Sequence, residues 1–185
     1  MNGIEVLLQE HENIEQFITA TQKICCGILE GDPVDGELFQ KMIEFGQTYA
    51  DQHHHQKEEQ ILFDEMSSHL GPVAQRLIQH GMLVEHDMGR FHLNQAKEAL
   101  ERYLASPNTF DKLQILTELT EYTNLLERHI EKENNVAYPF GQKNLSQESL
   151  ERIDRDTQAF EAQWESRRQE SMAFLSKLME RVNMH

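Results

Sequence analysis

The positions of the four prolines constrain the fold of this chain more than any other sequence feature. Pro33, Pro72, Pro107 and Pro139 each lie beside other turn-forming residues. Because proline breaks the interior of a helix or opens a new one, these positions predict five segments of roughly 30 to 40 residues with short connections. Each segment carries apolar residues at helical spacing, and none alternates apolar and polar residues like a half-buried strand. The chain is therefore predicted to form five amphipathic helices.

Sequential helices with short connections pack as antiparallel neighbours. The chain is therefore predicted to be all-α, with an up-down-up-down four-helix bundle over residues 1–140. Residues 141–185 should form an additional C-terminal helix that packs on the bundle, with Ser146 as its N-cap. The apolar stripe of this helix, which includes Trp164 and Phe174, is expected to face the core or a second copy of the chain.

The composition argues against several classes of partner. The 185 residues include 17 Lys and Arg against 32 Asp and Glu, which gives a formal charge of −15, whereas nucleic acids and anionic membranes attract basic surfaces. The sequence shows neither an apolar run long enough to cross a membrane nor a secretory signal at its start. We expect a cytoplasmic protein, a monomer or homodimer, that binds neither nucleic acid nor membrane.

An internal repeat sorts the ten histidines of this acidic chain. Residues 8–12 read LQEHE, and residues 83–87, which lie 75 positions later, read LVEHD. The same shift carries five residues of the second helix onto the fourth: His54, Lys57, Glu58, Ile61 and Phe63 map onto His129, Lys132, Glu133, Val136 and Tyr138. The bundle is therefore predicted to consist of two related helical hairpins.

The repeat selects four histidines and two glutamates as candidate metal ligands. In the second and fourth helices, a glutamate follows the histidine at i+4 and so lies on the same helical face. With a rise of ~1.5 Å per residue, all six side chains fall in one layer of the bundle. A buried layer of such groups needs compensation, which two divalent cations would supply. The predicted ligands are His11, His54, Glu58, His86, His129 and Glu133.

Other histidines and the two cysteines are expected to have ordinary roles. His53, His55 and His69 lie on other helical faces, and the 75-residue shift maps His55 onto an isoleucine. The same shift maps Glu59 onto an asparagine, so His55 and Glu59 are not predicted as a second ligand pair. Cys25 and Cys26 are too few for a disulfide framework; they could form a redox pair, but two small buried residues are the simpler expectation.

Five further side chains are open between an ordinary structural role and a supporting role at the metal site: Glu10, Tyr49, His80, Glu85 and Tyr122. The two glutamates precede ligand histidines and could orient them. The two tyrosines could donate a hydrogen bond to a group held by the metal. Solvation of the glutamates and core packing of the tyrosines are the simpler expectations.

The nitrogen and oxygen ligands indicate the class of metal. A set without thiolates argues against a structural zinc site, and a set with histidines argues against calcium and magnesium. Mixed histidine and carboxylate ligation in a helical bundle suits pairs of iron or manganese ions. Glu58 and Glu133 can each bridge both ions while each ion takes two histidines. Positions then remain for water, an oxo or hydroxo bridge, or a small diatomic ligand.

Four stretches of the chain also carry a family resemblance: LLQEHENIEQF, HHHQKEEQILF, GMLVEHDMGRF and ERHIEKENNVAYP. In this order they resemble the hemerythrin-like, HHE cation-binding family, and together they span residues 1–140. The resemblance implies a hemerythrin-like four-helix bundle with a non-haem di-iron centre, in which an oxo or hydroxo group bridges two iron ions. It places the iron ligands on the six residues of the repeat, with manganese or zinc as less favoured metals.

The ligand inventory departs from that of the oxygen-carrying hemerythrins, which have HxxxH on the third helix and HxxxxD on the fourth. Here Arg90 follows His86 at i+4, and Asn134 follows His129 at i+5. Four histidines and two glutamates look more like the branch that includes the iron–sulfur repair proteins. The short Cys-bearing N-terminal region of those proteins is missing, and Asp64 stands where the family usually has proline.

These features predict a protein that binds or reacts with dioxygen, nitric oxide or peroxide in a sensing, storage or redox role. The alternative is a di-iron enzyme or iron donor, in nitrosative or oxidative stress defence and iron–sulfur cluster repair, that would need an electron donor. A third possibility is a structural bundle that metal only staples together. The sequence leaves open whether the protein turns over as an enzyme.

Overall fold

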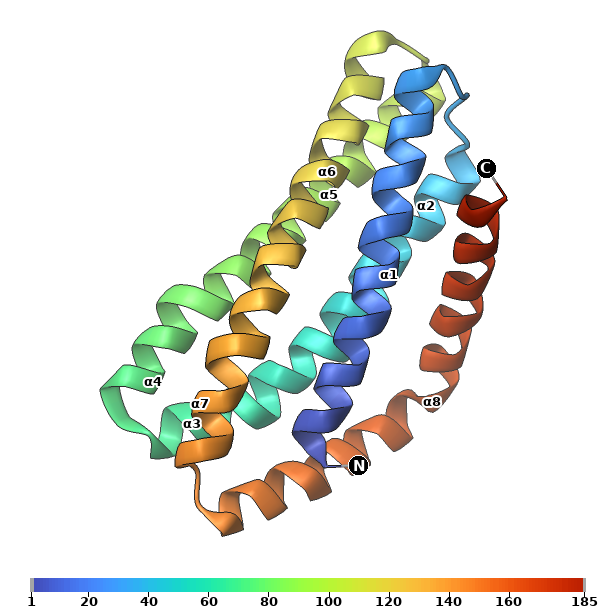
Figure 1. Ribbon diagram of the computed structural model, residues 1–185. Coiled ribbons are helices and arrows are strands. Elements are labelled where there is room, and N and C mark those ends of the chain that lie inside the picture. Colours follow the sequence, from blue (N-terminus) through green and yellow to red (C-terminus); the bar gives the residue numbers. More distant parts are fainter. Residues whose placement is uncertain (1, 185) are drawn as a thin grey trace.

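The computed structural model describes residues 2–184, and helices make up nearly all of this part of the chain (Figure 1). Five rods follow one another, several of them built from α-helical and π-helical segments without a break. They are α1 (Gly3–Glu30); α2 (Gly36–Phe45), η1 (Gly46–His55), η2 (Glu58–Leu62) and α3 (Phe63–His69); α4 (Gly71–Leu77), η3 (Ile78–Met82) and α5 (Leu83–Ala105); α6 (Thr109–Lys132), η4 (Glu133–Ala137) and α7 (Tyr138–Asn144); and α8 (Gln147–Asn183). The segments η1 to η4 are π-helical. The described residues contain no strand, which confirms the all-α prediction.

Polar caps define where several helices begin. Asn2 and Glu5 form a capping box at the start of α1, where each side chain accepts a hydrogen bond from the backbone N–H of the other. The predicted N-cap of α8 is confirmed, because the Ser146 hydroxyl oxygen accepts a hydrogen bond from the Ser149 N–H at 3.1 Å. These caps satisfy N–H groups that have no partner within the helix.

The predicted chain break at Pro139 is wrong. The fourth rod continues through this proline to Asn144, and the chain turns only at Leu145, whose backbone is extended. Pro139 lies in the first turn of α7, directly after η4, where the missing N–H of a proline is tolerated. The last helix begins at Gln147, directly after its predicted N-cap Ser146, so the break lies at Leu145 and not at the proline.

The first four rods form the bundle, and α8 packs against its outside. Figure 1 shows α8 passing below the N-terminal end of α1 and then running along the bundle beside α1 and α2. The Gly3 N–H donates a hydrogen bond to Asp154 at 2.7 Å. A Cβ atom on Gly3 would lie 2.8 Å from Ile153 Cγ2, so α1 and α8 cross in close contact. At the other end of α8, Arg181 forms a 2.9 Å ion pair with Asp35.

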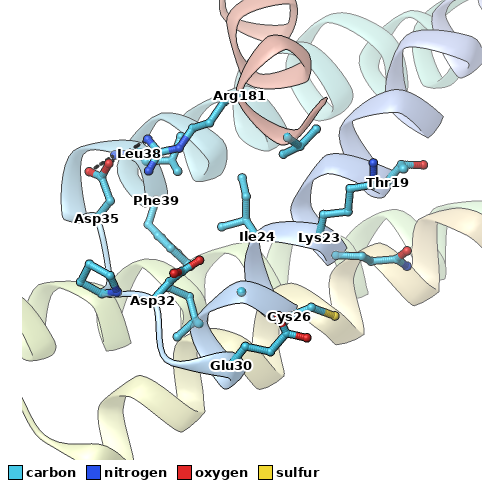
Figure 2. Close-up of a pocket in the computed structure, with 15 residues that line it drawn as sticks. Thr19, Lys23, Ile24, Cys26, Glu30, Asp32, Asp35, Leu38, Phe39 and Arg181 are labelled. Atoms are coloured by element: carbon cyan, nitrogen blue, oxygen red, sulfur yellow. Dashed lines mark hydrogen bonds and ion pairs between the residues drawn. The ribbon is translucent and has the colours of Figure 1, made fainter. Parts of the chain in front are cut away.

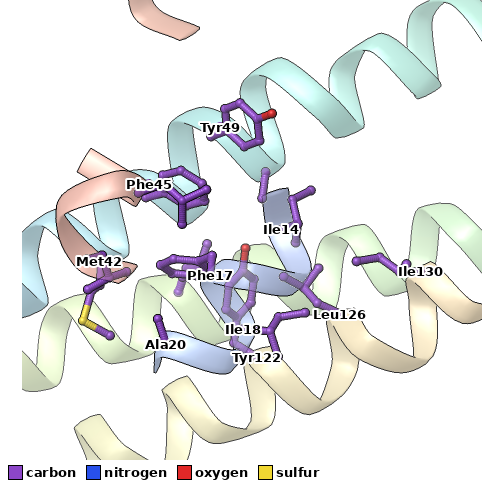
Figure 3. Packing of buried hydrophobic residues seen from close by; sticks show 14 of the residues in the cluster. Ile14, Phe17, Ile18, Ala20, Met42, Phe45, Tyr49, Tyr122, Leu126 and Ile130 are labelled. Atoms are coloured by element: carbon purple, nitrogen blue, oxygen red, sulfur yellow. The ribbon is translucent and has the colours of Figure 1, made fainter. Parts of the chain in front are cut away.

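Three apolar clusters follow one another along the bundle, and their order can be traced on α1. Leu7 belongs to the first cluster, Ile14 and Phe17 belong to the second, and Ile28 belongs to the third. Figure 3 shows the second cluster, where Phe17 stacks on Phe45 of α2, and Phe45 in turn stacks on Tyr49 of η1. His11 lies on α1 between the first two clusters. A polar layer is therefore enclosed by apolar packing on both sides, where unpaired polar groups are costly.

Candidate metal centre

The structure brings all six predicted ligands together in the layer between the first and second apolar clusters. Their side chains come from four rods, and each residue is at most 1% exposed. Their ligand atoms fall into two groups within which all atoms lie within 4.8 Å of one another. The first group consists of His11, His54, Glu58 and Glu133, and the second consists of His55, Glu58, His86 and His129. Glu58 belongs to both groups, as expected of a carboxylate that bridges two ions.

Each of the four histidines from the repeat is anchored through its outer ring nitrogen. The Nδ1 atoms of His11, His54, His86 and His129 lie 2.7, 2.9, 2.7 and 2.9 Å from side-chain oxygens of Asn134, Glu10, Glu59 and Glu85, respectively. Carboxylate and amide oxygens accept hydrogen bonds, so Nδ1 is the protonated nitrogen in each neutral ring. When all four rings are neutral, as metal binding requires, this assignment leaves every Nε2 atom with a free lone pair that faces the centre of the layer.

The inward-facing nitrogen and oxygen atoms repel one another unless a metal ion or a proton lies between them. The Nε2 atoms of His86 and His129 are only 3.0 Å apart. His11 Nε2 lies 3.2 Å from a carboxylate oxygen of Glu133. Several buried atoms here have no hydrogen-bond partner: His54 Nε2, Glu58 Oε2 and both Glu133 oxygens. Converging lone pairs on nitrogen and oxygen, with no donor to satisfy them, fit a pair of divalent cations.

Without metal, protons carry part of this compensation. Burial raises the pKa of Glu58 well above its ordinary value, and the nearby Glu133 carboxylate raises it further. Burial opposes the charge of His129, but Glu133 and Glu85 outweigh that effect and raise the pKa of His129 to about 9. Burial also opposes ionisation of Glu133, yet His129 holds the pKa of that carboxyl well below its ordinary value. Metal binding therefore has to displace protons from this layer.

A fifth histidine, His55, enters the second group although the sequence placed it on another helical face. It is 3% exposed, and its ring stacks on His86 with centroids 4.0 Å apart. The reason is the π-helical segment η1, which ends at His55. Hydrogen bonds from i to i+5 turn successive side chains through a smaller angle than in an α-helix, so α-helical spacing misplaces the face. The run of three histidines was the available signal.

Tyr138 is a second group that sequence reasoning missed. Its hydroxyl donates a hydrogen bond to Glu58 Oε1 at 2.5 Å and lies 3.2 Å from His11 Nε2. The Tyr138 ring stacks on His11, with centroids 5.3 Å apart, just as Phe63 stacks on His86 at 6.1 Å. The repeat relates Tyr138 to Phe63, but only the tertiary structure shows that the additional hydroxyl faces the ligand layer.

Comparison with known proteins agrees with this geometry. The profile of the hemerythrin HHE cation binding domain matches residues 2–140. The chain belongs to the hemerythrin HHE cation-binding family. It is thus a hemerythrin-like, metal-binding protein with an additional C-terminal helix beyond the matched region. No curated protein and no solved structure matches the chain. No helix within residues 2–184 has the length and apolar character needed to cross a membrane.

In this hemerythrin-like chain, the departures from the oxygen-carrying members have defined contacts. Arg90, which stands at i+4 from His86, donates hydrogen bonds to Glu59 at 2.7 Å and to Asp51 at 2.8 Å. It thereby holds the carboxylate that anchors His86. Asn134, at i+5 from His129, anchors His11 instead. Arg90 and Asn134 therefore support the outer Nδ1 side of the histidines, and neither belongs to the inward-facing groups of candidate ligand atoms.

The structure decides between an ordinary and a supporting role for the five side chains that the sequence left open. Glu10 and Glu85 anchor histidines, which is the supporting role. Tyr49 accepts a hydrogen bond from Asn13 at 2.8 Å, and Tyr122 is buried in the second cluster, so both tyrosines are core residues. His80 is exposed.

His69, Cys25 and Cys26, for which the sequence predicted no role at the metal site, lie away from the inward-facing layer. The exposed side of α3 carries His69, which bonds the Glu65 carbonyl of its own helix at 2.9 Å. Cys25 is buried, as predicted, and burial raises its pKa to about 12. The prediction is wrong for Cys26, which lies off the buried face of α1 and is exposed. Figure 2 shows Cys26 at a cavity of about 890 Å³ near the junction of α1 and α2, to which α8 contributes Arg181. The six predicted ligands do not line this cavity.

Proposed function

We propose that this hemerythrin-like protein holds two iron ions and binds or reacts with dioxygen, nitric oxide or peroxide. The proposed ligands are His11, His54, Glu58, His86, His129 and Glu133, with His55 as an additional donor to the second ion. One observation carries the proposal: the Nε2 atoms of four anchored imidazoles and the oxygens of two buried carboxylates converge on the same layer of the bundle. Histidine and carboxylate donors in a bundle core favour paired iron.

The enclosure of the layer favours a small ligand. The proposed ligands are almost completely buried between two apolar clusters, so a bulky substrate could not reach them without opening the bundle. Iron held there would supply open coordination positions and one-electron redox chemistry. The Tyr138 hydroxyl can hold a proton beside Glu58 and His11. The acidic surface and the cation-binding domain suit a cytoplasmic protein that does not act on nucleic acid.

Anaerobic iron loading is the test of this function. The full chain is loaded with Fe²⁺ without oxygen, and the iron content and the absorption and Mössbauer spectra are measured before and after addition of dioxygen or nitric oxide. We expect two ions per chain and a spectral change with each reactive ligand. His54→Ala and His129→Ala should each lower the iron content, whereas the surface control His69→Ala should keep both ions.

Three outcomes would separate the alternatives. Failure to bind iron, or tight binding of one zinc ion, would contradict the proposal. Repeated turnover of peroxide or nitric oxide with an added electron donor would favour the di-iron enzyme, for which the buried Tyr138 hydroxyl is the supporting observation. A spectral change of the iron-loaded protein on addition of dioxygen, nitric oxide or peroxide would exclude a metal that only staples the bundle together.

A further inference from the structure

The repeat extends from the inward-facing layer to the groups behind it. His54 Nδ1 contacts Glu10 at 2.9 Å, and Glu10 in turn contacts Lys57. At the related position, His129 Nδ1 contacts Glu85 at 2.9 Å, and Glu85 contacts Lys132. The same histidine, glutamate and lysine therefore stand in line behind each of the two metal positions. We name these lines the first arm (His54, Glu10 and Lys57) and the second arm (His129, Glu85 and Lys132).

The C-terminal helix breaks the equivalence of these two arms. The Lys57 side chain is fully buried, whereas the Lys132 side chain is 49% exposed. In the first arm, the Lys57 ammonium contacts a second carboxylate, Glu161 of α8. Phe160 of α8 also covers this ammonium, with its ring centroid 5.6 Å away. The second arm ends in solvent at Lys132.

Glu161 is held firmly at the end of the first arm. His53 Nε2 lies 2.8 Å from the same carboxylate oxygen that contacts Lys57. Burial alone would raise the pKa of Glu161, but its hydrogen bonds with His53 and Lys57 lower it to about 2. Arg168 pairs with the other carboxylate oxygen at 3.7 Å and is 37% exposed, so water screens its charge. Glu10, His53 and Glu161 could form a cation site, but the Lys57 ammonium already supplies the cation.

We propose that Glu161 of α8 is a positioning residue that makes the His54 metal position bind its ion more tightly than it would through the first arm alone. This inference rests on the metal centre proposed above. Lys57 draws charge away from Glu10 and weakens the hydrogen bond that Glu10 accepts from His54. Glu161 contacts the same ammonium, so Lys57 withdraws less charge from Glu10. Glu10 then accepts a stronger hydrogen bond from His54 Nδ1, and His54 Nε2 donates its lone pair more strongly to the metal. One negative charge also remains near the ion, with little water to screen it.

Co²⁺ titration of the full chain tests this assignment, because its absorption bands report the ligands around each ion. His129→Ala and His54→Ala provide backgrounds that retain the first or the second position, respectively. In the His129→Ala background, Glu161→Gln should weaken Co²⁺ binding about tenfold, the lower end for loss of a residue behind a ligand, and shift the absorption bands. In the His54→Ala background, the same substitution should change neither the affinity nor the bands.

Two controls separate a specific contact from general effects. Glu165→Gln makes the same charge change one turn along α8 at a half-exposed side chain that pairs with Arg168, so it should leave both positions unchanged. In a double-mutant cycle, Lys57→Met should reduce the effect of Glu161→Gln, because Glu161 then has no ammonium to share and acts through its charge alone. Circular dichroism and thermal melting show whether each variant is folded, and Glu161→Asp provides a second variant if the glutamine variant is not.

The outcomes distinguish this inference from the metal centre itself. Equal weakening at both positions, or no weakening at the His54 position in folded Glu161→Gln protein, would overturn the role of Glu161 while leaving the metal centre intact. A wild-type chain that binds no Co²⁺ at all would overturn the metal centre and this inference together.

Discussion

At the residue scale, the candidate centre depends as much on the groups behind the histidines as on the histidines themselves. His86 is anchored by a carboxylate, whereas its repeat counterpart His11 is anchored by the neutral amide of Asn134. An anchoring carboxylate makes an imidazole a stronger donor than an amide does. The two halves of the centre are therefore related in geometry but differ in chemistry.

His55→Ala tests the proposed ligand that the sequence did not predict. Because its ring lies in the second group of ligand atoms, we expect its loss to weaken binding of the second ion by at least about tenfold, the minimum typical for loss of a supporting residue. The measurement is a Co²⁺ titration of wild type and variant. His69→Ala is the control, and equal affinities for His55→Ala and wild type would show that His55 only packs against His86.

Tyr138→Phe tests the hydroxyl that the structure places on Glu58. In the metal-free protein, the substitution removes the donor to a buried carboxyl oxygen and should lower the free energy of unfolding by about 1–3 kcal/mol. Bound metal should reduce this loss, because Glu58 then has a cation as its partner. Urea unfolding with and without Co²⁺ measures both values. Tyr103→Phe, in the third cluster, is the control, and a loss that metal leaves unchanged would contradict this account.

At the element scale, the π-helical segments and α8 decide how the predicted helices present their residues. The segment η1 ends at His55, and the segments η2 and η4 begin at Glu58 and Glu133, all of them proposed ligands. Such segments are frequent at functional sites because they change the direction of side chains without ending the rod. The helix α8 then closes one side of the bundle through its contacts with α1 and η1.

Gly3→Ala tests the crossing of α1 and α8. The added methyl group would lie 2.8 Å from both Ile153 Cγ2 and Thr157 Oγ1, so overpacking should lower the free energy of unfolding by about 1–3 kcal/mol. Gly81→Ala is the matched control, because the added atom would have no neighbour within 4 Å. In a helix, that control should be neutral or stabilising by roughly 0.5–1 kcal/mol. Equal unfolding curves for the two variants would mean that the crossing can relax without cost.

At the scale of the whole molecule, metal binding and folding should be coupled, because the proposed ligands come from four rods. An ion that binds only the folded chain stabilises it by about 4 kcal/mol at a free concentration one thousand times its dissociation constant. We expect the melting temperature to rise steadily with added Co²⁺. The rise should be smaller in His129→Ala, and a melting temperature independent of metal in wild type would contradict this coupling.

The metal-free protein should lose stability in acid. Burial beside His86 lowers the pKa of His55 from 6.5 to about 3, and Glu161 is lowered from 4.5 to about 2 by its partners despite burial. Both groups bind protons more readily in the unfolded chain, so their contributions are lost as pH falls from about 6.5 to about 2. Urea midpoints measured across this range should decrease. Glu161→Gln should make the urea midpoint less dependent on pH below pH 4.5. An unchanged slope there would contradict a contribution of Glu161 to the loss of stability in acid.

The sequence by itself determined the five helices, the bundle, the repeat and the six residues that meet in its buried layer. These features depend on local spacing: prolines end or open helices, apolar residues recur with the helical period, and a shift of 75 positions preserves the ligand types. Only the tertiary structure decided that His55 joins the layer, that Pro139 does not end its rod and that Glu161 reaches Lys57. The π-helical segments alter the rotation that α-helical spacing assumes. The contact of Glu161 joins residues about a hundred positions apart, and the packing of α8, rather than any local pattern, brings them together.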